Sequence, residues 1–477
     1  MTHDVENAST TPGLPISLGL GPVLEKADIE RHPRQLDRKS LRLSAFAIGL
    51  ALVVTPIARL LMMLIGLITN FVFYGRFSTD LVSPAGSHLG LWVIVLPVAG
   101  SLIVGLMARY GAKAIRGHGI PEAMEQILTN DSRIPVRMTF LKPLSAAITI
   151  GTGGPFGAEG PIIATGGALG SLLGQVVHVT AHERKTLLAA GAAAGMTAIF
   201  GTPFSAILLA IELLVFEFRP RSFIPVAIAA LTAITLRPLL FGTAPVIAMP
   251  VFAAVPQAAL LSYALEGVVI GLFAVVIAKS TYVIEDLFEK LPIHWMWWPA
   301  IGGLVVGVVG FVSPHTLGVG YDNIEHILSG HFLGSALIVF CLLKFVSWSV
   351  SLGSGTSGGT LAPIFTIGGG LGVMIAEAVQ AVAPWAGIDL GMAGLVGMAA
   401  CFAGASRALF ASVLFALEIT GQYTTLLPLL AGCSTAFMVS AFVMKNTIMT
   451  EKLARRGHHV PSEYVPYPSL RPRTESH

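Results

Sequence analysis

Charge is scarce in this sequence. Of its 477 residues, 12% are Asp, Glu, Lys or Arg and 54% are hydrophobic, and the mean hydropathy is +0.77. Soluble domains carry roughly 25% charged residues. No Lys or Arg occurs between Lys290 and Lys344, or between Lys344 and Arg407, and each interval is much longer than the roughly 20 residues that one bilayer crossing requires. The composition excludes a soluble globular protein and predicts an all-α protein that crosses the membrane several times.

Cysteine is also rare. Cys341, Cys401 and Cys433 are odd in number and lie in apolar runs, so we interpret them as small core residues and not as disulfides. The thirteen histidines show no ligand spacing such as HxxxH on one helix face. We therefore expect neither a metal site nor another cofactor. The net charge of +3 is small and lies mainly in the termini and loops, which does not indicate a nucleic-acid partner.

The polar N-terminal tail, residues 1–40, ends in a basic cluster directly before the first apolar segment, Leu41 to Phe73. No apolar core with a cleavage site precedes this cluster, so we predict no signal peptide. The positive-inside rule places the tail in the cytoplasm, and we expect the C-terminal tail, 456–477, on the same side. That second tail is too short for a further regulatory domain.

Several apolar segments are short and are broken by glycine or proline. Broken helices at membrane depth are tolerated only where they face protein or a watery cavity. Transporters use such half-helices at the membrane midplane. Ordinary receptors and single-span anchors do not have such a series of short, broken segments. The segments are Pro121 to Leu128, Met138 to Ile150, Pro161 to Leu173, Thr186 to Ile199 and Pro203 to Phe218.

One stretch is unusually rich in glycine: Gly151-Thr-Gly-Gly-Pro-Phe-Gly-Ala-Glu-Gly-Pro161, which leads into a helix-prone apolar segment. Glycine leaves backbone N–H groups uncovered, and Pro161 suits the first turn of a helix. A glycine-rich turn before a helix start forms an anion site from main-chain dipoles alone.

The same stretch recurs about 200 residues later, which indicates an internal duplication. Glu159 falls opposite Leu361, so two similar scaffolds surround a single ionisable group. A shift of 202 places Gly151, Gly153, Gly157, Pro161, Ile162, Gly166, Gly167, Leu169 and Gly170 on Gly353, Gly355, Gly359, Pro363, Ile364, Gly368, Gly369, Leu371 and Gly372. A shift of 206 places Phe204, Leu208, Ala210 and Glu212 on Phe410, Leu414, Ala416 and Glu418.

Three motifs each open a short apolar helix: Gly117-His-Gly-Ile-Pro121, Gly157-Ala-Glu-Gly-Pro161 and Gly359-Thr-Leu-Ala-Pro363. If the three helix starts converge, their N–H groups and positive dipole ends form a dehydrated anion site. No Lys or Arg occurs between Lys142 and Arg184, or near the third motif. We interpret this absence as a site of partial charges, which bind an anion weakly enough to release it.

These motifs, their order, the duplication and the closing Lys452-Leu-Ala-Arg-Arg-Gly457 resemble the CLC family of chloride channels and chloride/proton exchangers. The resemblance covers about residues 41–457. It implies an inverted repeat of about 18 helices, many of them broken or re-entrant, with repeat one at about 41–240 and repeat two at about 256–450 of a transmembrane domain spanning 41–455. It further implies a homodimer with one pore per subunit, a multi-pass protein of a bacterial cell membrane and a short form without C-terminal CBS domains.

The resemblance also implies roles for individual residues. Glu159 matches the family's gating glutamate, whose carboxylate can occupy the outer anion position and leaves it when protonated or displaced. The alternative is a glutamate that only complements a helix dipole. The backbone ligands of the anion would be Ala158, Glu159, Gly160, Thr360, Leu361 and Ala362, with Gly117, His118, Gly119 and Gly157 completing the predicted anion-binding set.

His118 departs from the family, because chloride-selective members usually have serine in the first motif. A neutral imidazole N–H can donate to an anion, and a protonated imidazole would bind it harder. A histidine that titrates near neutrality would make transport sensitive to cytoplasmic pH. The alternative is a histidine turned into the vestibule with little effect. The substitution leaves open whether chloride is preferred over nitrate.

Two further positions depart from the family. Met449 aligns with the inner tyrosine that many members place near the C-terminal helix, and a thioether cannot donate the matching hydrogen bond. Leu213 stands where the well-known exchangers have a second, proton-carrying glutamate. The neighbouring Glu212 repeats as Glu418, so we favour packing or capping over proton transfer for it. Glu217, a turn further on, is a weaker proton-path candidate.

We favour chloride conduction gated by Glu159, with weak or atypical proton coupling. The second interpretation is an anion/proton antiporter that uses water or His118 as its inner proton path. A third class is an intramembrane enzyme, prompted by Ser354, Ser357 and His331. An enzyme needs a nucleophile and a base on facing helices, and the sequence shows no matched pair.

Overall fold

The computed structural model describes residues 38–247, 249–252, 255–257, 259–458 and 460. The predicted tails, 1–40 and 456–477, lie almost wholly outside these residues. Within the described chain, about 17 α-helices, α2 to α18, follow one another. Eight of them are long and apolar enough to cross a membrane. The chain is therefore the all-helical polytopic protein that its composition predicts.

The short apolar segments of the first half form separate helices, as the glycine and proline breaks predict. Proline stands at the first or second position of α4 and α8, where its missing N–H costs no helical hydrogen bond. The helices are α2 (Arg38–Tyr74), α3 (Trp92–Tyr110), α4 (Ile120–Thr129), α5 (Val136–Gly151), α6 (Glu159–Val176), α7 (Ala181–Phe200), α8 (Pro203–Ala210), which continues as a π-helical turn (Ile211–Val215), and α9 (Pro220–Phe241).

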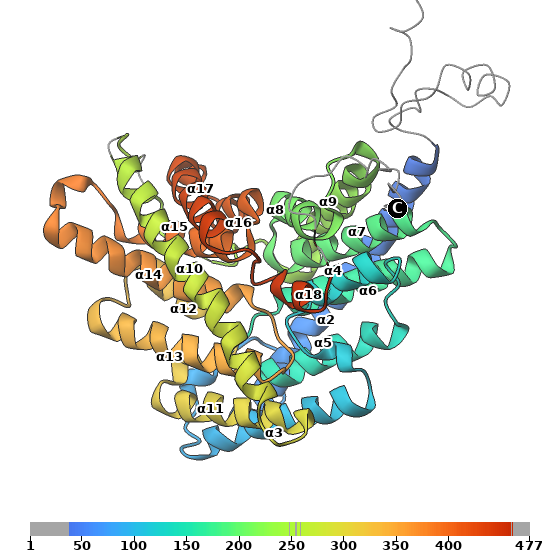
Figure 1. Ribbon diagram of the computed structural model, residues 1–477, viewed down its shortest axis with the longest axis horizontal. Helices are drawn as coiled ribbons and strands as arrows, with labels where there is room; N and C mark the ends of the chain where they lie inside the picture. Colours follow the sequence, from blue (N-terminus) through green and yellow to red (C-terminus); the bar gives the residue numbers. More distant parts are fainter. Residues whose placement is uncertain (1–37, 248, 253–254, 258, 459, 461–477) are drawn as a thin grey trace, which may run out of the picture.

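The second half repeats this order of long and short helices. Figure 1 shows the α2–α9 half in blue to green beside the α10–α17 half in yellow to red. The helices are α10 (Ala259–Glu289), α11 (Trp298–Val312), α12 (Tyr321–Leu328), α13 (Gly334–Gly353), α14 (Leu361–Val382), α15 (Leu390–Ser406), α16 (Leu409–Thr420), α17 (Leu426–Val443) and the short α18 (Glu451–Arg455).

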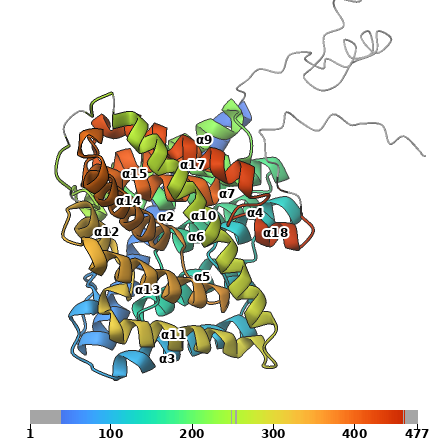
Figure 2. The ribbon, with the colours of Figure 1, turned by 60° about the vertical axis from the view of Figure 1, so that its left-hand side comes forward.

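One contact between the two halves lies at one end of the molecule, where α3 packs on α11. Figures 1 and 2 both show this pair at the bottom of the view. Gly307 allows the close approach, because a Cβ there would overlap main-chain atoms of Ile94. Small residues commonly line contacts between membrane helices, since lipid supplies no hydrophobic drive for association.

The duplicated glycines make the same contact in both halves. A Cβ on Gly166 of α6 would overlap the carbonyl oxygen of Gly191 on α7, and a Cβ on Gly368 of α14 would lie 2.6 Å from the carbonyl oxygen of Gly397 on α15. These contacts bring α6 against α7, and α14 against α15, at backbone distance. The repeated glycines therefore fix the helices that carry the second and third motifs.

Carboxylates join the two halves through reciprocal helix caps. Glu212, in the π-helical turn that continues α8, accepts hydrogen bonds of 3.2 Å from the N–H groups of Phe410 and Ala411 at the start of α16. Glu418, at the end of α16, accepts hydrogen bonds of 2.9 and 2.8 Å from the N–H groups of Phe204 and Ser205 at the start of α8. The role in capping that we favoured for Glu212 is thus what its contacts show.

The three cysteines are free and buried, in agreement with their interpretation as core residues. They lie on α13, α15 and α17: Cys341, Cys401 and Cys433.

We predict that Gly166→Ala destabilises the protein by about 1–3 kcal/mol, because the added methyl group must push α6 away from α7. Thermal unfolding of the detergent-purified protein, followed by circular dichroism, measures the change. The matched control is Gly49→Ala in α2, where a Cβ meets nothing within 4 Å and the higher helix propensity of alanine should slightly stabilise. Equal unfolding midpoints for the two variants would contradict the close-packing role.

Candidate anion-binding site

The three glycine-rich loops meet in the middle of the molecule, as the sequence led us to expect. Main-chain hydrogen bonds connect Gly157 and Gly359 in both directions, at 3.4 and 3.1 Å, and the Gly117 N–H donates to Thr356 O at 2.9 Å. These bonds form isolated β-bridges between Gly157 and Gly359 and between Gly117 and Ser357. The second and third motifs are thus in direct contact, and the first lies beside the loop that precedes the third.

Two helices start at this junction with buried N–H groups that no side chain caps. Neither α6 nor α14 has a side-chain cap at its N-terminus. The first N–H groups of a helix have no intrahelical partner. Within the described chain, none of the predicted ligand N–H groups makes a main-chain hydrogen bond: those of Ala158, Glu159, Gly160, Thr360, Leu361 and Ala362.

Glu159 lies between these helix starts and is fully buried. Its side chain turns back over its own loop, so that a Cβ on Gly157 would overlap the carboxylate and a Cβ on Gly359 would lie 3.1 Å from Oε2. Gly157 is therefore required by the position of the carboxylate, whereas a Cβ on Gly359 would first meet the carbonyl oxygen of Gly157, at 2.5 Å. Oε2 has no hydrogen-bond partner among the described residues.

Tyr321 holds the other carboxylate oxygen: its hydroxyl donates a 3.0 Å hydrogen bond to Glu159 Oε1. The tyrosine ring packs edge-on against Phe200, with ring centroids 5.9 Å apart, and Phe200 packs on Phe415. The aromatic rings fix the direction of the hydroxyl group. A residue 162 positions away in the sequence thus orients the carboxylate of Glu159.

Tyr321 was not among the site residues predicted from the sequence, although the duplication contained the signal. A shift of 201 places Gly117, Gly119 and Ile120 on Gly318, Gly320 and Tyr321. Gly119 and Gly320 both have positive φ, +96° and +75°, and are the N-cap residues of α4 and α12. The first motif therefore has its own second copy, which opens α12 and presents Tyr321.

The first motif is built differently from the other two. Glu122 accepts the Gly119 N–H at 2.7 Å as part of a capping box, and the Gly117 N–H is taken by Thr356. We expected both glycines to contribute to anion binding, but their N–H groups are engaged within the protein. His118, between them, is 5% exposed, and its Nδ1 has no hydrogen-bond partner among the described residues.

His118 belongs to a loop outside the membrane-spanning helices. Burial lowers its pKa to about 4, and the positive charges of Lys452 and Lys142 add to this effect against the opposing pull of Glu122. The surroundings therefore favour a neutral imidazole at physiological pH. This differs from the titration near neutrality that we expected from the residue type alone.

A full positive charge lies beside the first motif, contrary to our expectation of a site without cations. Lys142 of α5 is buried, and its ammonium donates to Ile115 O at 2.8 Å and to Gly117 O at 2.7 Å. The absence of Lys and Arg between Lys142 and Arg184 does not make the site free of cations. In the folded chain the side chain of Lys142 itself reaches Gly117. Partial dipoles alone do not describe this end of the site.

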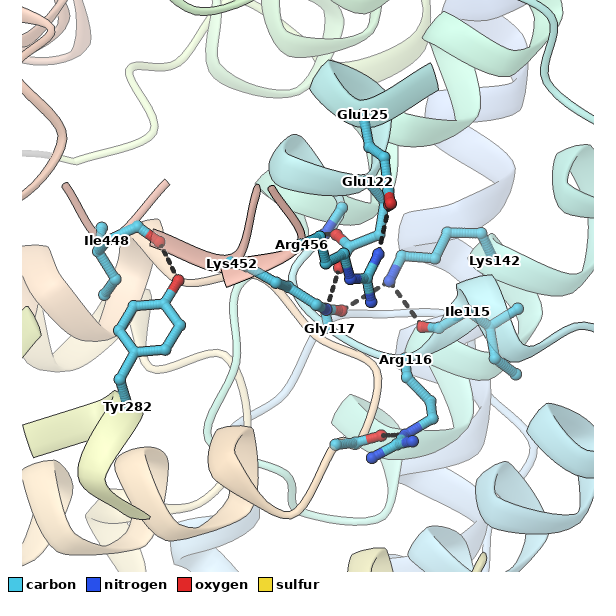
Figure 3. A network of polar contacts seen from close by, with 12 residues as sticks. Ile115, Arg116, Gly117, Glu122, Glu125, Lys142, Tyr282, Ile448, Lys452 and Arg456 are labelled. Carbon is cyan, nitrogen blue, oxygen red and sulfur yellow. Dashed lines mark hydrogen bonds and ion pairs between the residues drawn. The ribbon is translucent and has the colours of Figure 1, made fainter. Parts of the chain in front are cut away.

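A cavity of about 500 Å³ opens next to the first motif. We call it the α18-side cavity; Figure 3 shows the polar contacts at its wall. Tyr282 of α10 donates a 2.7 Å hydrogen bond to Ile448 O, directly before Met449. Met449 is itself fully buried. The charged and polar lining of the α18-side cavity includes Lys113, Arg116, His118, Glu122, Glu125, Lys142, Tyr282, Glu285, Glu289, Lys452 and Arg456.

The proton-path candidates of the sequence analysis lie elsewhere. Neither Glu212 nor Glu217 lines the α18-side cavity. Glu217 accepts a 2.6 Å hydrogen bond from Ser222 and lies 3.5 Å from His182. Leu213 is buried, and the carboxylate of Glu212 is engaged at the start of α16.

The serines that prompted the enzyme interpretation bond to other groups. Ser354 donates to Ser351 O at 2.6 Å, and Ser357 accepts from Ser145 at 2.9 Å. Among the described residues, neither serine hydrogen-bonds to His331, whose ring lies edge-on to His326 with ring centroids 5.7 Å apart.

Known proteins resemble this chain over most of its length. A family model described as voltage gated chloride channel matches residues 100–441. A protein of Ralstonia nicotianae, named as a ClcB-like chloride channel protein, is 28% identical over 366 residues, which cover 76% of this chain and 85% of that protein. The H(+)/Cl(−) exchange transporter ClcA of Salmonella paratyphi B is 29% identical over 403 residues, 79% of this chain and 82% of its own.

Solved structures share the fold. The crystal structure of a slow cyanobacterial Cl−/H+ antiporter matches with a TM-score of 0.79 and 21% identity, covering 88% of this chain and 98% of that one. The crystal structure of a CLC-type fluoride/proton antiporter matches with a TM-score of 0.69 and 24% identity, and the match covers 83% of this chain and 95% of that one. Because the family model spans well over half of the chain, this protein belongs to the CLC family of voltage gated chloride channels and transporters, which carry anions and are not enzymes.

Proposed function

We propose that this chain passes chloride or a similar small anion across the membrane through the junction of the three loops, with Glu159 as the gate. The observation that carries the proposal is the position of the Glu159 carboxylate. It lies buried between the uncapped starts of α6 and α14, where main-chain donors have no other partner. A carboxylate and a halide require the same donors, so the two compete for one place.

We favour conduction with weak proton coupling over obligatory exchange. The position at which well-known exchangers have a proton glutamate holds Leu213, and Glu212 caps a helix. Exchange remains the alternative, because relatives carry both channel and exchanger names. In that case water or His118 would carry protons on the inner side. Chloride is the favoured anion, with nitrate the principal competitor because of His118.

The remaining expectations about assembly also belong to the proposal. The chain would work as a homodimer with one pore in each subunit, in a bacterial cell membrane. Its α18 side would face the cytoplasm, as the basic residues near both ends of the described chain indicate.

Glu159→Ala should leave an anion flux that no longer responds to external pH, because no carboxylate remains to occupy the site or to take up a proton. Chloride efflux from proteoliposomes, measured with a chloride electrode at several external pH values, tests this. Glu217→Ala serves as the matched control, since it removes a carboxylate outside the site and should keep the pH response. A pH response that survives in Glu159→Ala would place the gate elsewhere.

The zero-current potential separates conduction from exchange. For a conductor, the potential in a planar bilayer should follow the Nernst potential of the anion and should not move when a tenfold proton gradient is imposed. A shift with the proton gradient would establish coupling and would favour the antiporter. Replacing chloride by nitrate on one side gives the anion preference in the same recording.

His118→Ser should leave the pH profile of the flux unchanged between about pH 5.5 and 7.5, because the histidine is already neutral there. A pKa lowered to about 4 by burial means that the charged form, which binds an anion harder, appears only in more acidic solution. Flux measured with the α18 side at pH 4 to 7.5 should therefore separate the variant from the wild type near pH 4. Loss of a transition between pH 5.5 and 7.5 in the variant would show that His118 titrates near neutrality after all.

A further inference from the structure

Tyr321 brings a hydroxyl group to the junction of the loops. This hydroxyl donates to Glu159 Oε1 at 3.0 Å. The main-chain N–H of Ala158 lies near the same hydroxyl, and that of Ala362 lies near the Glu159 carboxylate. The hydroxyl is therefore a side-chain donor at the place where main-chain donors from both repeats are predicted to hold the anion.

The loop that presents Tyr321 is attached to the glycine-rich stretch 151–161. The Gly318 N–H donates to Gly153 O at 3.0 Å. Gly318 and Gly320 have positive φ, +68° and +75°, a conformation that glycine adopts without steric cost. The position of Tyr321 at the start of α12 is thus fixed by main-chain contacts that do not involve the gating carboxylate.

A series of aromatic rings keeps the hydroxyl in its place. The Tyr321 ring packs on Phe200 and Phe200 packs on Phe415, which stacks on Phe365 of α14 with ring centroids 4.8 Å apart. Because several rings would have to move together, the hydroxyl stays where it is when Glu159 leaves. Tyr321 is half-buried, and a shielded donor that loses its acceptor costs free energy until another acceptor takes its place.

Tyr321 also lines a second cavity, of about 240 Å³, which we call the α12-side cavity. It has no lining residue in common with the α18-side cavity. The first motif borders the α18-side cavity, and the second copy of that motif, Gly318 to Tyr321, borders the α12-side cavity. Glu159 does not line either of them. Tyr321 therefore contacts the gating carboxylate on one side and this cavity on the other.

The α12-side cavity is poor in groups that would retain an anion. Within the described chain, no Lys, Arg or His lines it, whereas the carboxylates of Asp322 and Glu325 do. The Thr69 hydroxyl, also in the lining, already donates to Ile65 O at 2.9 Å. A conducted ion must be bound weakly enough to leave. The neutral hydroxyl of Tyr321 suits an anion that is held briefly and then released.

We propose that the Tyr321 hydroxyl is a shared donor, which holds Glu159 while the gate is closed and becomes a ligand of the anion when the carboxylate leaves. The ligand class is a monovalent inorganic anion such as chloride, which accepts the same hydrogen bond as the carboxylate oxygen that it replaces. The inference rests on the proposed function, since it requires that anion and carboxylate compete at this junction.

Calorimetric titration of the purified full-length chain with chloride, at constant ionic strength, tests the proposal in two backgrounds. In Glu159→Ala the hydroxyl is free for the anion. Adding Tyr321→Phe should therefore raise the chloride dissociation constant on the order of tenfold, because a hydrogen bond to a charged group is lost. With Glu159 present, Tyr321→Phe weakens both the closed gate and the bound anion. The two losses offset each other, and the constant should stay within about threefold of the wild type.

Tyr263→Phe in α10 is the matched control. Tyr321→Phe keeps the ring and its packing on Phe200, so the fold should survive the loss of the hydroxyl. Tyr263 is likewise buried, and its hydroxyl accepts the Asp389 N–H at 3.1 Å at the start of α15. Removing that hydroxyl should leave chloride affinity unchanged in both backgrounds. A loss equal to that of Tyr321→Phe would overturn the proposal, since the effect would then come from general loosening of the fold.

Two other outcomes would overturn the proposal. Unchanged affinity when Tyr321→Phe is added to Glu159→Ala would mean that the free hydroxyl does not bind the anion. An equal loss of affinity in both backgrounds would mean that the hydroxyl binds the anion but does not hold the gate, so that the donor is not shared.

The titration also separates this inference from the proposed function. Weaker chloride binding on adding Tyr321→Phe to Glu159→Ala, in a protein whose wild type passes no chloride, would keep the hydroxyl as an anion ligand and reject transport. Wild-type chloride flux that responds to external pH, with no effect of Tyr321→Phe on affinity in Glu159→Ala, would keep the gate and reject the hydroxyl as a ligand.

Discussion

The main-chain hydrogen bonds between Gly157 and Gly359 are the contact on which the rest of the structure depends. They hold the starts of α6 and α14 face to face, so that unpaired N–H groups from two repeats surround the carboxylate of Glu159. A side chain at Gly157 would occupy the space of that carboxylate, and one at Gly359 would overlap the carbonyl oxygen of Gly157. The glycine contacts between α6 and α7, and between α14 and α15, then keep both helix starts at this distance. Irregular main chain at membrane depth is tolerated where it is buried within protein, and at this junction the residues of both helix starts are buried.

The sequence predicted the elements better than their contacts. The apolar segment 161–173 lies within α6, and the segment 203–218 covers α8 and its π-helical extension, because glycine, proline and apolar runs are local signals. The meeting of the three loops followed from their similarity. The contact of Tyr321 with Glu159 and that of Lys142 with Gly117 did not, since they depend on how distant helices pack. Glu122 was overlooked for another reason: a capping box was present in the sequence, but an anion role for Gly119 was assumed first.

The two repeats also place a buried lysine at equivalent positions near the site. Lys142 and Lys344 are 202 positions apart and both are buried. Lys142 donates to main-chain oxygens around the first motif, and Lys344 donates to Thr316 O at 2.9 Å, close to the second copy of that motif. Each ammonium stiffens a glycine loop through its carbonyl oxygens, while Glu122 on one side and Asp322 on the other lie near enough to offset the charge. The helix starts therefore act within a field that contains full charges of both signs.

The reciprocal caps have a consequence for the origin of the chain. Glu212 seals a helix of the second half, and Glu418 seals a helix of the first. A half-length ancestor would have carried one acid without a helix to cap and one helix start without an acid. Two such ancestors would have completed each other at this contact, as the two halves of the present chain do. Neither half of the present chain can therefore close all of its own helix starts, and each depends on an acid that the other supplies.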